Sequence, residues 1–105
     1  MTDLDTDLDT VLVAVADPTR RAMLQRLAHG PATTGQLAEL FPISRPAVSQ
    51  HLRVLQDAGL VRTDARGRHR WHQLDPRPLD HAGGWFRALV DRHATAPSLQ
   101  PEEPP

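Results

Sequence analysis

The side chains best suited to chemistry in this sequence are arginines, and half of them lie in one block. Residues 45–70 contain six of the twelve arginines against only two acidic residues, whereas the whole chain of 105 residues has a formal net charge of −1. Each guanidinium presents five N–H donors in a planar fork, which matches phosphate oxygens and the edge of guanine. A near-neutral chain with one basic block indicates a localised anionic partner, so the position of the block matters more than the total charge.

The sequence lacks the motifs of most catalytic and metal sites. The absence of cysteine excludes disulfides, zinc ribbons, thiolate metal sensing and cysteine nucleophiles. No G-x-S-x-G, H-E-x-x-H or phosphate-cradling glycine loop is present, so we expect no enzyme and no cofactor. The alternating Asp3–Asp9 run lacks the glycine and glutamate that a calcium loop needs at its sixth and twelfth positions.

The basic block must be positioned by several short helices. An amphipathic helix is expected over residues 3–16, and a second begins at Asp17-Pro18 and ends near Gly30, with Met23, Leu24, Leu27 and Ala28 as its buried stripe. Thr33 or Thr34 caps a third helix that runs to about Leu40, whose inward residues are Leu37, Ala38 and Leu40.

The fourth helix is expected from Arg45 to about Ala58, with Ser44 as its cap and Gly59 at its end. Val48, Leu52 and Leu55 share one face at about 100° per residue, and small, polar and basic side chains occupy the other. Such a helix is built to lie against a polar surface.

After Gly59 the period changes to that of strands. Residues 60–65 and 69–74 predict a hairpin with Gly67 in its turn, and Leu79 to about His93 predicts a last helix. The fold class is therefore mainly α with a small β-hairpin (α+β), in the order helix, helix, helix, helix, strand, strand, helix. Two consecutive helices followed by a basic hairpin form a winged helix-turn-helix pattern, in which one helix enters the major groove and the hairpin reaches a neighbouring groove or phosphate. A winged helix used only for protein–protein contact is the alternative.

Four stretches resemble the ArsR/SmtB family of bacterial transcriptional repressors: D-P-T-R-R-A-M-L-Q-R-L, T-T-G-Q-L-A-E-L, S-R-P-A-V-S-Q-H-L-R-V-L-Q-D-A-G-L-V and R-G-R-H-R-W-H-Q-L-D. The resemblance spans Ala16 to about Asp75, and the chain is most similar to the cysteine-free, often autoregulatory branch. It implies a winged-helix homodimer that occupies a double-stranded DNA operator near its own promoter. Many members release DNA on sensing a metal or another signal, and the inducer of this chain, if there is one, is unknown.

Carried over by position, the resemblance places the DNA contacts on the fourth helix and the hairpin. Ser49 and His51 match the family's S-x-H pair, which typically contacts the DNA backbone, and Arg45 and Gln50 fall at variable positions where base choice is expected. The full set of expected DNA-binding residues is Ser44, Arg45, Ala47, Ser49, Gln50, His51, Arg53, Arg66, Arg68 and Arg70.

Neither metal site of the family is complete. The positions of its Cys-x-Cys pair align with about Thr33 and Gly35, and its D-x-H motif is present as Asp91-x-His93 without the later histidine, which would fall at Pro104. We therefore expect no metal site; a metal-responsive repressor with His and Asp ligands in the last helix is the alternative. The isolated His29, His69 and His72 are expected to be solvated or, in the hairpin, to face DNA.

A homodimer built from the first and last helices is expected, because their apolar residues exceed what a small monomer readily buries. The interface residues are Leu4, Leu8, Leu12, Val15, Trp85, Phe86 and Leu89. Gly83-Gly84 indicates either close approach of two such helices or a helix that begins only at Trp85.

The ends of the chain are polar. Residues 1–94 form the DNA-binding and dimerisation domain, and the Pro-rich acidic residues 95–105 are expected to be a disordered tail. No apolar run approaches the ~20 residues of a membrane span, and the first residues are acidic. We expect a cytoplasmic protein with no membrane partner.

Overall fold

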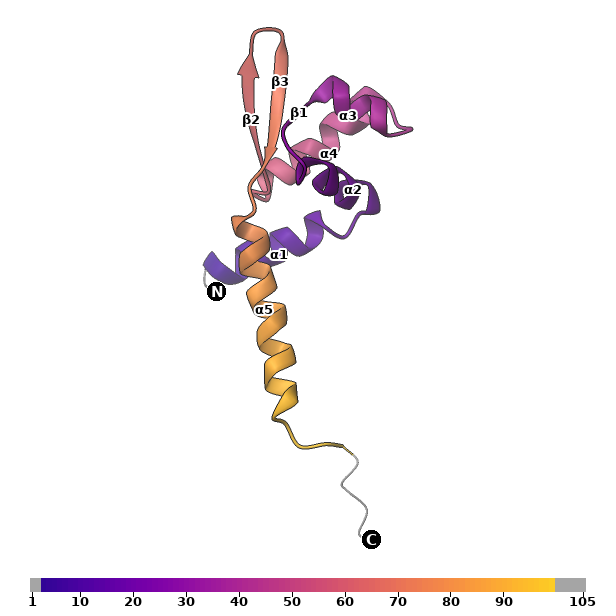
Figure 1. Cartoon of the computed structure of the whole chain (residues 1–105). Helices are drawn as coiled ribbons and strands as arrows, with labels where there is room; N and C mark the ends of the chain where they lie inside the picture. Colours follow the sequence, from indigo (N-terminus) through magenta and orange to yellow (C-terminus); the bar gives the residue numbers. More distant parts are fainter. Residues whose placement is uncertain (1–2, 100–105) are drawn as a thin grey trace.

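The chain folds into helices around a small sheet, from which a hairpin rises at one end and a long helix leaves at the other (Figure 1). The computed structural model describes residues 3–99, and side chains from Leu8 onwards. Its elements are α1 (Asp3–Ala14), α2 (Pro18–Leu27), β1 (Ala32–Thr33), α3 (Thr34–Leu40), α4 (Arg45–Asp57), β2 (Val61–Arg66), β3 (His69–Leu74) and α5 (Arg77–Ala94). The winged helix-turn-helix architecture expected from the sequence is confirmed.

The helices begin where the sequence places their caps. Asp17 Oδ2 accepts from the Arg20 amide at 2.9 Å, and Ser44 Oγ accepts from the Ala47 amide at 3.2 Å. Thr33 and Gln36 form a reciprocal capping box at the start of α3, with distances of 3.1 and 2.9 Å. These bonds satisfy amides that no helical carbonyl can reach.

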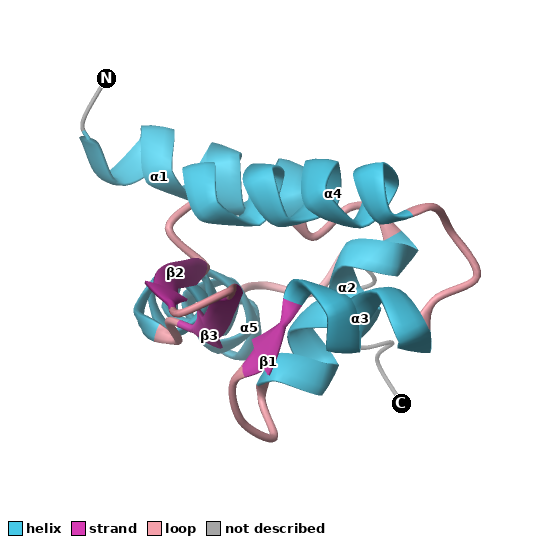
Figure 2. Cartoon of the chain, turned by 90° about the horizontal axis from the view of Figure 1, so that it is seen from above, coloured by secondary structure: helices cyan, strands magenta, loops and turns pink. Residues whose placement is uncertain are grey.

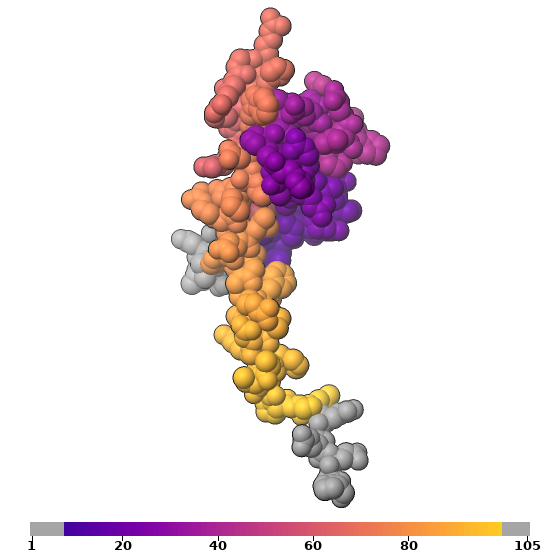
Figure 3. Space-filling model, viewed as in Figure 1, coloured from indigo at the N-terminus to yellow at the C-terminus, as the bar shows by residue number. Residues whose placement is uncertain are grey.

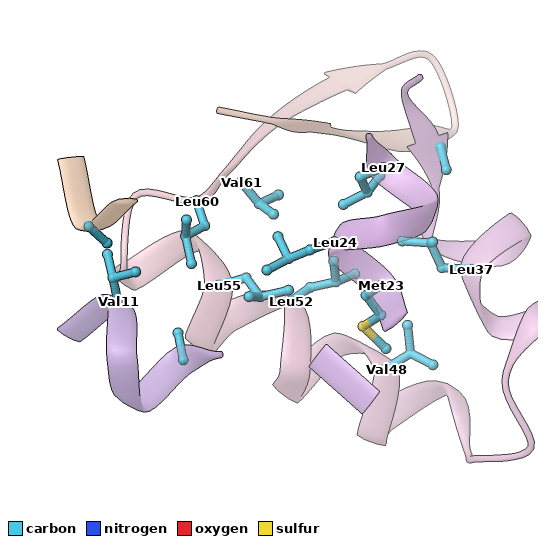
Figure 4. Packing of buried hydrophobic residues seen from close by; sticks show 13 residues of the cluster. Val11, Met23, Leu24, Leu27, Leu37, Val48, Leu52, Leu55, Leu60 and Val61 are labelled. Atoms are coloured by element: carbon cyan, nitrogen blue, oxygen red, sulfur yellow. The ribbon is translucent and has the colours of Figure 1, made fainter. Parts of the chain in front are cut away.

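The hydrophobic core lies between α4, α2 and the strands (Figure 4). Figure 2 shows α4 lying across α2 and α3, with the hairpin to one side. Val48, Leu52 and Leu55 of α4 are 0–2% exposed. The other buried apolar residues are Val11, Ala14, Met23, Leu24, Leu27, Ala32, Leu37, Leu60, Val61 and Ala82.

Two residues expected to face inward do not. Leu40 has the helical spacing of the buried Leu37, but it is the last residue of α3 and is 56% exposed, because the chain leaves the core there. Ala28 is the C-cap of α2 and is also exposed. Both residues lie where the helix stops, so the helical period no longer decides which side is buried.

The sheet has one strand more than the sequence predicts. Its order is β1-β3-β2, and the two-residue β1 pairs Ala32 with His72 and Thr33 with Trp71. The hairpin register runs from Val61↔Leu74 to Arg66↔His69, and Gly67 adopts a φ of 62° in the turn. A left-handed backbone suits glycine at that turn position.

The last helix begins at Arg77, two residues earlier than expected, with proline in its first turn. Gly83 and Gly84 therefore lie inside α5, and the interpretation of a helix beginning at Trp85 is wrong. Asp75 is buried and accepts from Arg77 Nη2 at 2.6 Å and Nε at 3.0 Å. Hydrogen bonds from Arg77 hold the pKa of the Asp75 carboxyl at about 2.

His72 is buried, contrary to the expectation of a solvated or DNA-facing histidine. Its side chain points to the inner face of the sheet, where Nε2 is 2.7 Å from Thr34 Oγ1 and Nδ1 is 2.9 Å from Thr63 Oγ1. Thr63 Oγ1 also accepts from Gln56 Nε2 of α4 at 2.6 Å. This chain of hydrogen bonds, named here the His72 network, joins α3, α4 and both strands of the hairpin. Burial, with a smaller effect of the Arg70 guanidinium, lowers the pKa of His72 below its ordinary value of 6.5.

Acid is therefore expected to destabilise the fold through His72. Because the pKa is lower in the folded chain, the unfolded chain takes up the proton first, and the free energy of unfolding falls as the pH drops below about 6.5. Asp75 also contributes to the free energy of unfolding, but that contribution is lost only between pH 3.8 and about 2, where its carboxyl titrates. Urea denaturation from pH 5 to 8 is expected to show a flatter dependence for His72→Gln. His69→Gln, on the same strand but exposed, serves as the control. An equal slope in both variants would contradict this role of His72.

Candidate nucleic-acid interface

The outward face of α4 is the centre of the interface. Because Val48, Leu52 and Leu55 are buried, the opposite side of the helix carries Gln50 and Arg53, both exposed. The side chains of Gln50 and Ser49 form no hydrogen bond with any described group, so their side-chain polar atoms are open to an incoming ligand. Arg53 Nε lies 3.4 Å from Asp57 Oδ1, but both side chains are more than two-thirds exposed. An exposed pair of this kind contributes at most ~1 kcal/mol, so Arg53 is easily released to a phosphate.

Three other sequence-predicted residues of α4 have structural contacts. Ser44 Oγ is occupied by its cap, and Ala47 is half-buried. Arg45 folds back along α3: its Nη2 is 3.4 Å from the position that a Cβ on Gly35 would occupy. The structure thus places Arg45 at the edge of the outward face rather than at its centre.

His51 is also on α4 but turns towards α2. Its Nδ1 lies 3.3 Å from Arg20 Nη1 and 4.0 Å from Asp17 Oδ2, and its side chain is 23% exposed. Arg20 was not expected beside His51, because the two residues are 31 positions apart in the chain.

The wing is the hairpin formed by β2 and β3 (Figure 1), and it carries the second group of cations. Arg66, Arg68 and Arg70 are all exposed around its turn at Gly67. Arg66 Nη2 is 3.5 Å from Asp64 Oδ2, whereas the side chains of Arg68 and Arg70 form no ion pair or hydrogen bond with residues 8–99. Seven of the ten expected residues are exposed, and their side chains form no hydrogen bond with the described residues. Two of them, Arg53 and Arg66, have only an exposed ion pair. The seven are Arg45, Ser49, Gln50, Arg53, Arg66, Arg68 and Arg70.

The last helix extends beyond the body of the protein (Figure 3) and exposes large apolar side chains there. Trp85, Phe86 and Leu89 are 46–50% exposed, and Val90, which was not among the expected interface residues, is 54% exposed. The rings of Trp85 and Phe86 meet edge to face at 5.2 Å. The radius of gyration is 18.6 Å, against about 13 Å for a compact domain of this length.

Most of the apolar side chains described in and just after the first helix are more buried than the exposed apolar residues of α5. Val11 and Ala14 are buried in the chain's own core, and Leu8 and Val15 are half-buried against it. Leu12 is also half-buried. The side chain of Leu4 lies outside the described residues.

No group of three or more histidine and acidic side chains that could hold a metal ion occurs in the described part of the chain. Asp91, the first residue of the incomplete D-x-H motif, accepts instead from Arg87 Nε at 3.2 Å. A hollow of about 740 Å³ lies on the outer face of the sheet beside Pro31, Arg62 and Trp71. Within residues 3–99, no helix is long and apolar enough to cross a membrane.

A recognition helix with an open polar face, braced by a preceding helix and flanked by a basic wing, defines a winged helix-turn-helix DNA-binding protein. A helix-turn-helix domain model matches residues 15–64. The chain is 51% identical over 87 residues to the HTH-type transcriptional regulator Rv2034 of Mycobacterium tuberculosis, covering 78% of this chain and 81% of that protein. It is 32% identical to the transcriptional repressor SdpR of Bacillus subtilis, covering 81% of this chain and 94% of that protein.

The solved structures agree. The crystal structure of an ArsR family transcriptional regulator superposes with a TM-score of 0.84 at 33% identity, over 92% of this chain and all of that chain. The protein belongs to the ArsR/SmtB family and is a DNA-binding transcriptional regulator. The family named from the sequence motifs is thus confirmed.

The incomplete metal sites generate a prediction. Zn²⁺, Co²⁺ or Ni²⁺ in stoichiometric excess is expected to change the affinity for DNA by less than about threefold, whereas an effector typically shifts it by ~1–3 kcal/mol. Fluorescence anisotropy with a labelled duplex, with and without each metal, measures this. A tenfold loss of affinity that His93→Ala abolishes would show that α5 does hold a metal.

Proposed function

We propose that the protein is a homodimeric repressor that binds an inverted-repeat operator, with the DNA just upstream of its own gene as the first place to map it. The observation that carries this proposal is the combination of two surfaces on one chain: the open polar face of α4 with its wing, and the uncovered apolar face of α5. A two-fold dimer repeats the first surface, so the half-sites are expected about one or two turns apart, each turn being 10–10.5 bp.

The two parts of the DNA interface have different roles. Gln50 projects from a rigid helix without an intrachain partner, and a glutamine so held can form a bidentate pair with adenine. Arg68 lies exposed in the hairpin turn, where no described group orients its guanidinium, so it contacts phosphates or enters the minor groove. Its contribution then arises from counterion release and is independent of base sequence.

These roles are separable by salt dependence. Arg68→Ala is expected to weaken binding to the operator and to a random duplex alike, and to reduce the slope of log K against log[salt] by about one unit. Gln50→Ala is expected to lose ~1–3 kcal/mol of discrimination between the two duplexes with little change of slope. Arg92→Ala, which removes an exposed arginine at the far end of α5, and Gln25→Ala on α2 are the matched controls. If Arg68→Ala loses only operator affinity at a fixed slope, the wing reads bases.

The dimer is tested on α5. At micromolar concentration, sedimentation is expected to give a dimer, and Leu89→Asp is expected to give a monomer that binds the operator at least tenfold more weakly. Leu40→Asp introduces the same charge at a side chain of similar exposure on α3 and is expected to leave the sedimentation unchanged. A wild-type monomer that still binds its operator tightly would contradict the proposal, as would a protein that binds no duplex but captures a protein partner through α4.

A further inference from the structure

A polar cluster behind the outward face of α4 connects three helices. Arg20 of α2 donates from Nε to the carbonyl of Ala14 at 2.7 Å and from Nη2 to the carbonyl of Val13 at 3.1 Å. These are carbonyls of the last turn of α1, where the regular helical amide partners are missing. The carbonyl of Val13 also accepts from the amide of Ala16 at 3.2 Å. The third nitrogen of the same guanidinium, Nη1, reaches His51 on α4. One side chain thus caps α1 and contacts the recognition helix.

The contact with Arg20 fixes the proton of the histidine ring. A guanidinium has donors and no acceptor, so at 3.3 Å the Nδ1 of His51 must accept. While it accepts, Nδ1 carries no proton, and the ring proton lies on Nε2. The other charged group that faces Nδ1 is Asp17, whose Oδ2 is 4.0 Å away and already accepts from the amide of Arg20.

The outer nitrogen of His51 has no hydrogen-bond partner among residues 8–99, whose side chains the structure describes. No buried side-chain nitrogen or oxygen in this part of the chain lacks a partner, so Nε2 is not buried. His51 lies on the flank of α4 opposite to Gln56, five residues and about 140° away, and Gln56 contacts the wing through Thr63. The free N–H donor is therefore at the edge of the outward face remote from the wing.

We propose that Arg20 is a positioning residue for DNA binding. The resemblance already implies that His51 contacts the DNA backbone; the new element is that the Arg20 guanidinium orients the ring so that its Nε2–H faces outwards, towards a phosphate oxygen along this flank of α4. The proposal rests on the DNA-binding mode proposed above. It also gives the recognition helix and α1 a common anchor, because the guanidinium that orients His51 is the one that caps α1. A phosphate contact on this flank would complement those of the wing on the other.

A pair of variants of His51 tests the outward donor. In His51→Asn the amide oxygen can replace Nδ1 as the acceptor for Arg20, but no donor reaches the Nε2 position. In His51→Gln the longer side chain can place an amide N–H there. We expect Asn to weaken binding to operator and random duplex alike, by about tenfold as for a lost hydrogen bond to a charged group, and Gln to stay within about threefold of wild type. Because the donor is neutral, the salt slope is expected to stay unchanged in both variants, unlike in Arg68→Ala.

The role of Arg20 is tested without DNA. Long-range ¹H–¹⁵N correlation spectra of the wild-type imidazole at pH 7.5 are expected to show the proton of His51 on Nε2. Arg20→Met, which keeps the apolar stem and removes the donors, is expected to give a mixture of tautomers, and Arg20→Lys is expected to restore the single form in part. Far-ultraviolet circular dichroism checks that each variant is folded.

Two results would overturn the proposal: a wild-type His51 with its proton on Nδ1, or a His51→Asn protein that binds both duplexes as tightly as wild type. If the wild type protects no DNA and binds no duplex, the proposed function fails instead. The tautomer measurement would still decide whether Arg20 controls the ring.

Discussion

The burial of one narrow stripe on α4 is the constraint on which the rest of this structure depends. Val48, Leu52 and Leu55 are almost fully removed from solvent, and each such side chain contributes roughly 1.5–3 kcal/mol through the hydrophobic effect. When one face of a helix packs in the core, the opposite face is left in contact with water or a ligand. The recognition surface is thus defined by what α4 buries, and the small and polar residues opposite the stripe are free to vary with the DNA sequence.

Polar contacts then set how the neighbouring elements are oriented about α4. The His72 network attaches the hairpin to one flank of the helix through Gln56 and Thr63, and to α3 through Thr34. On the other flank, Arg20 connects α4 to the end of α1. Apolar contacts tolerate small rotations, whereas hydrogen bonds in a buried setting are costly to leave unmade. These two groups of hydrogen bonds therefore determine the orientation of the wing and of α1 relative to α4 more closely than the apolar contacts do.

Local signals in the sequence were sufficient for the helices, the hairpin and the outward face of α4. Asp17, Thr33 and Ser44 cap because their side chains bond to amides only a few residues away, and Gly67 turns the hairpin through its own backbone. What the sequence could not provide were contacts between distant residues. The burial of His72 depends on Thr34, 38 positions earlier, and no period or cap along β3 distinguishes it from the exposed His69.

The same distinction applies to the site. The exposed residues of α4 and the wing followed from helical spacing and charge, but Arg20 was not expected, because its role depends on a tertiary contact with His51. The start of α5 was misplaced although its signal is local. Asp75 accepts from the amide of Arg77 at 3.1 Å and also from its guanidinium, only two residues along the chain, and Pro78 follows in the first turn of the helix.

The two-residue strand β1 has a consequence for the order in which the chain folds. It pairs with β3 across 40 residues, and closing a loop of that length costs on the order of 3 kcal/mol in chain entropy. Two residues of ladder, at about 1 kcal/mol for each hydrogen bond, cannot offset that cost alone. The helices and the β2–β3 hairpin need only local hydrogen bonds, so we expect the pairing of β1 with β3 to form once α2 and α3 have packed onto α4. The direction of the hairpin in the native protein is then a property of the assembled core.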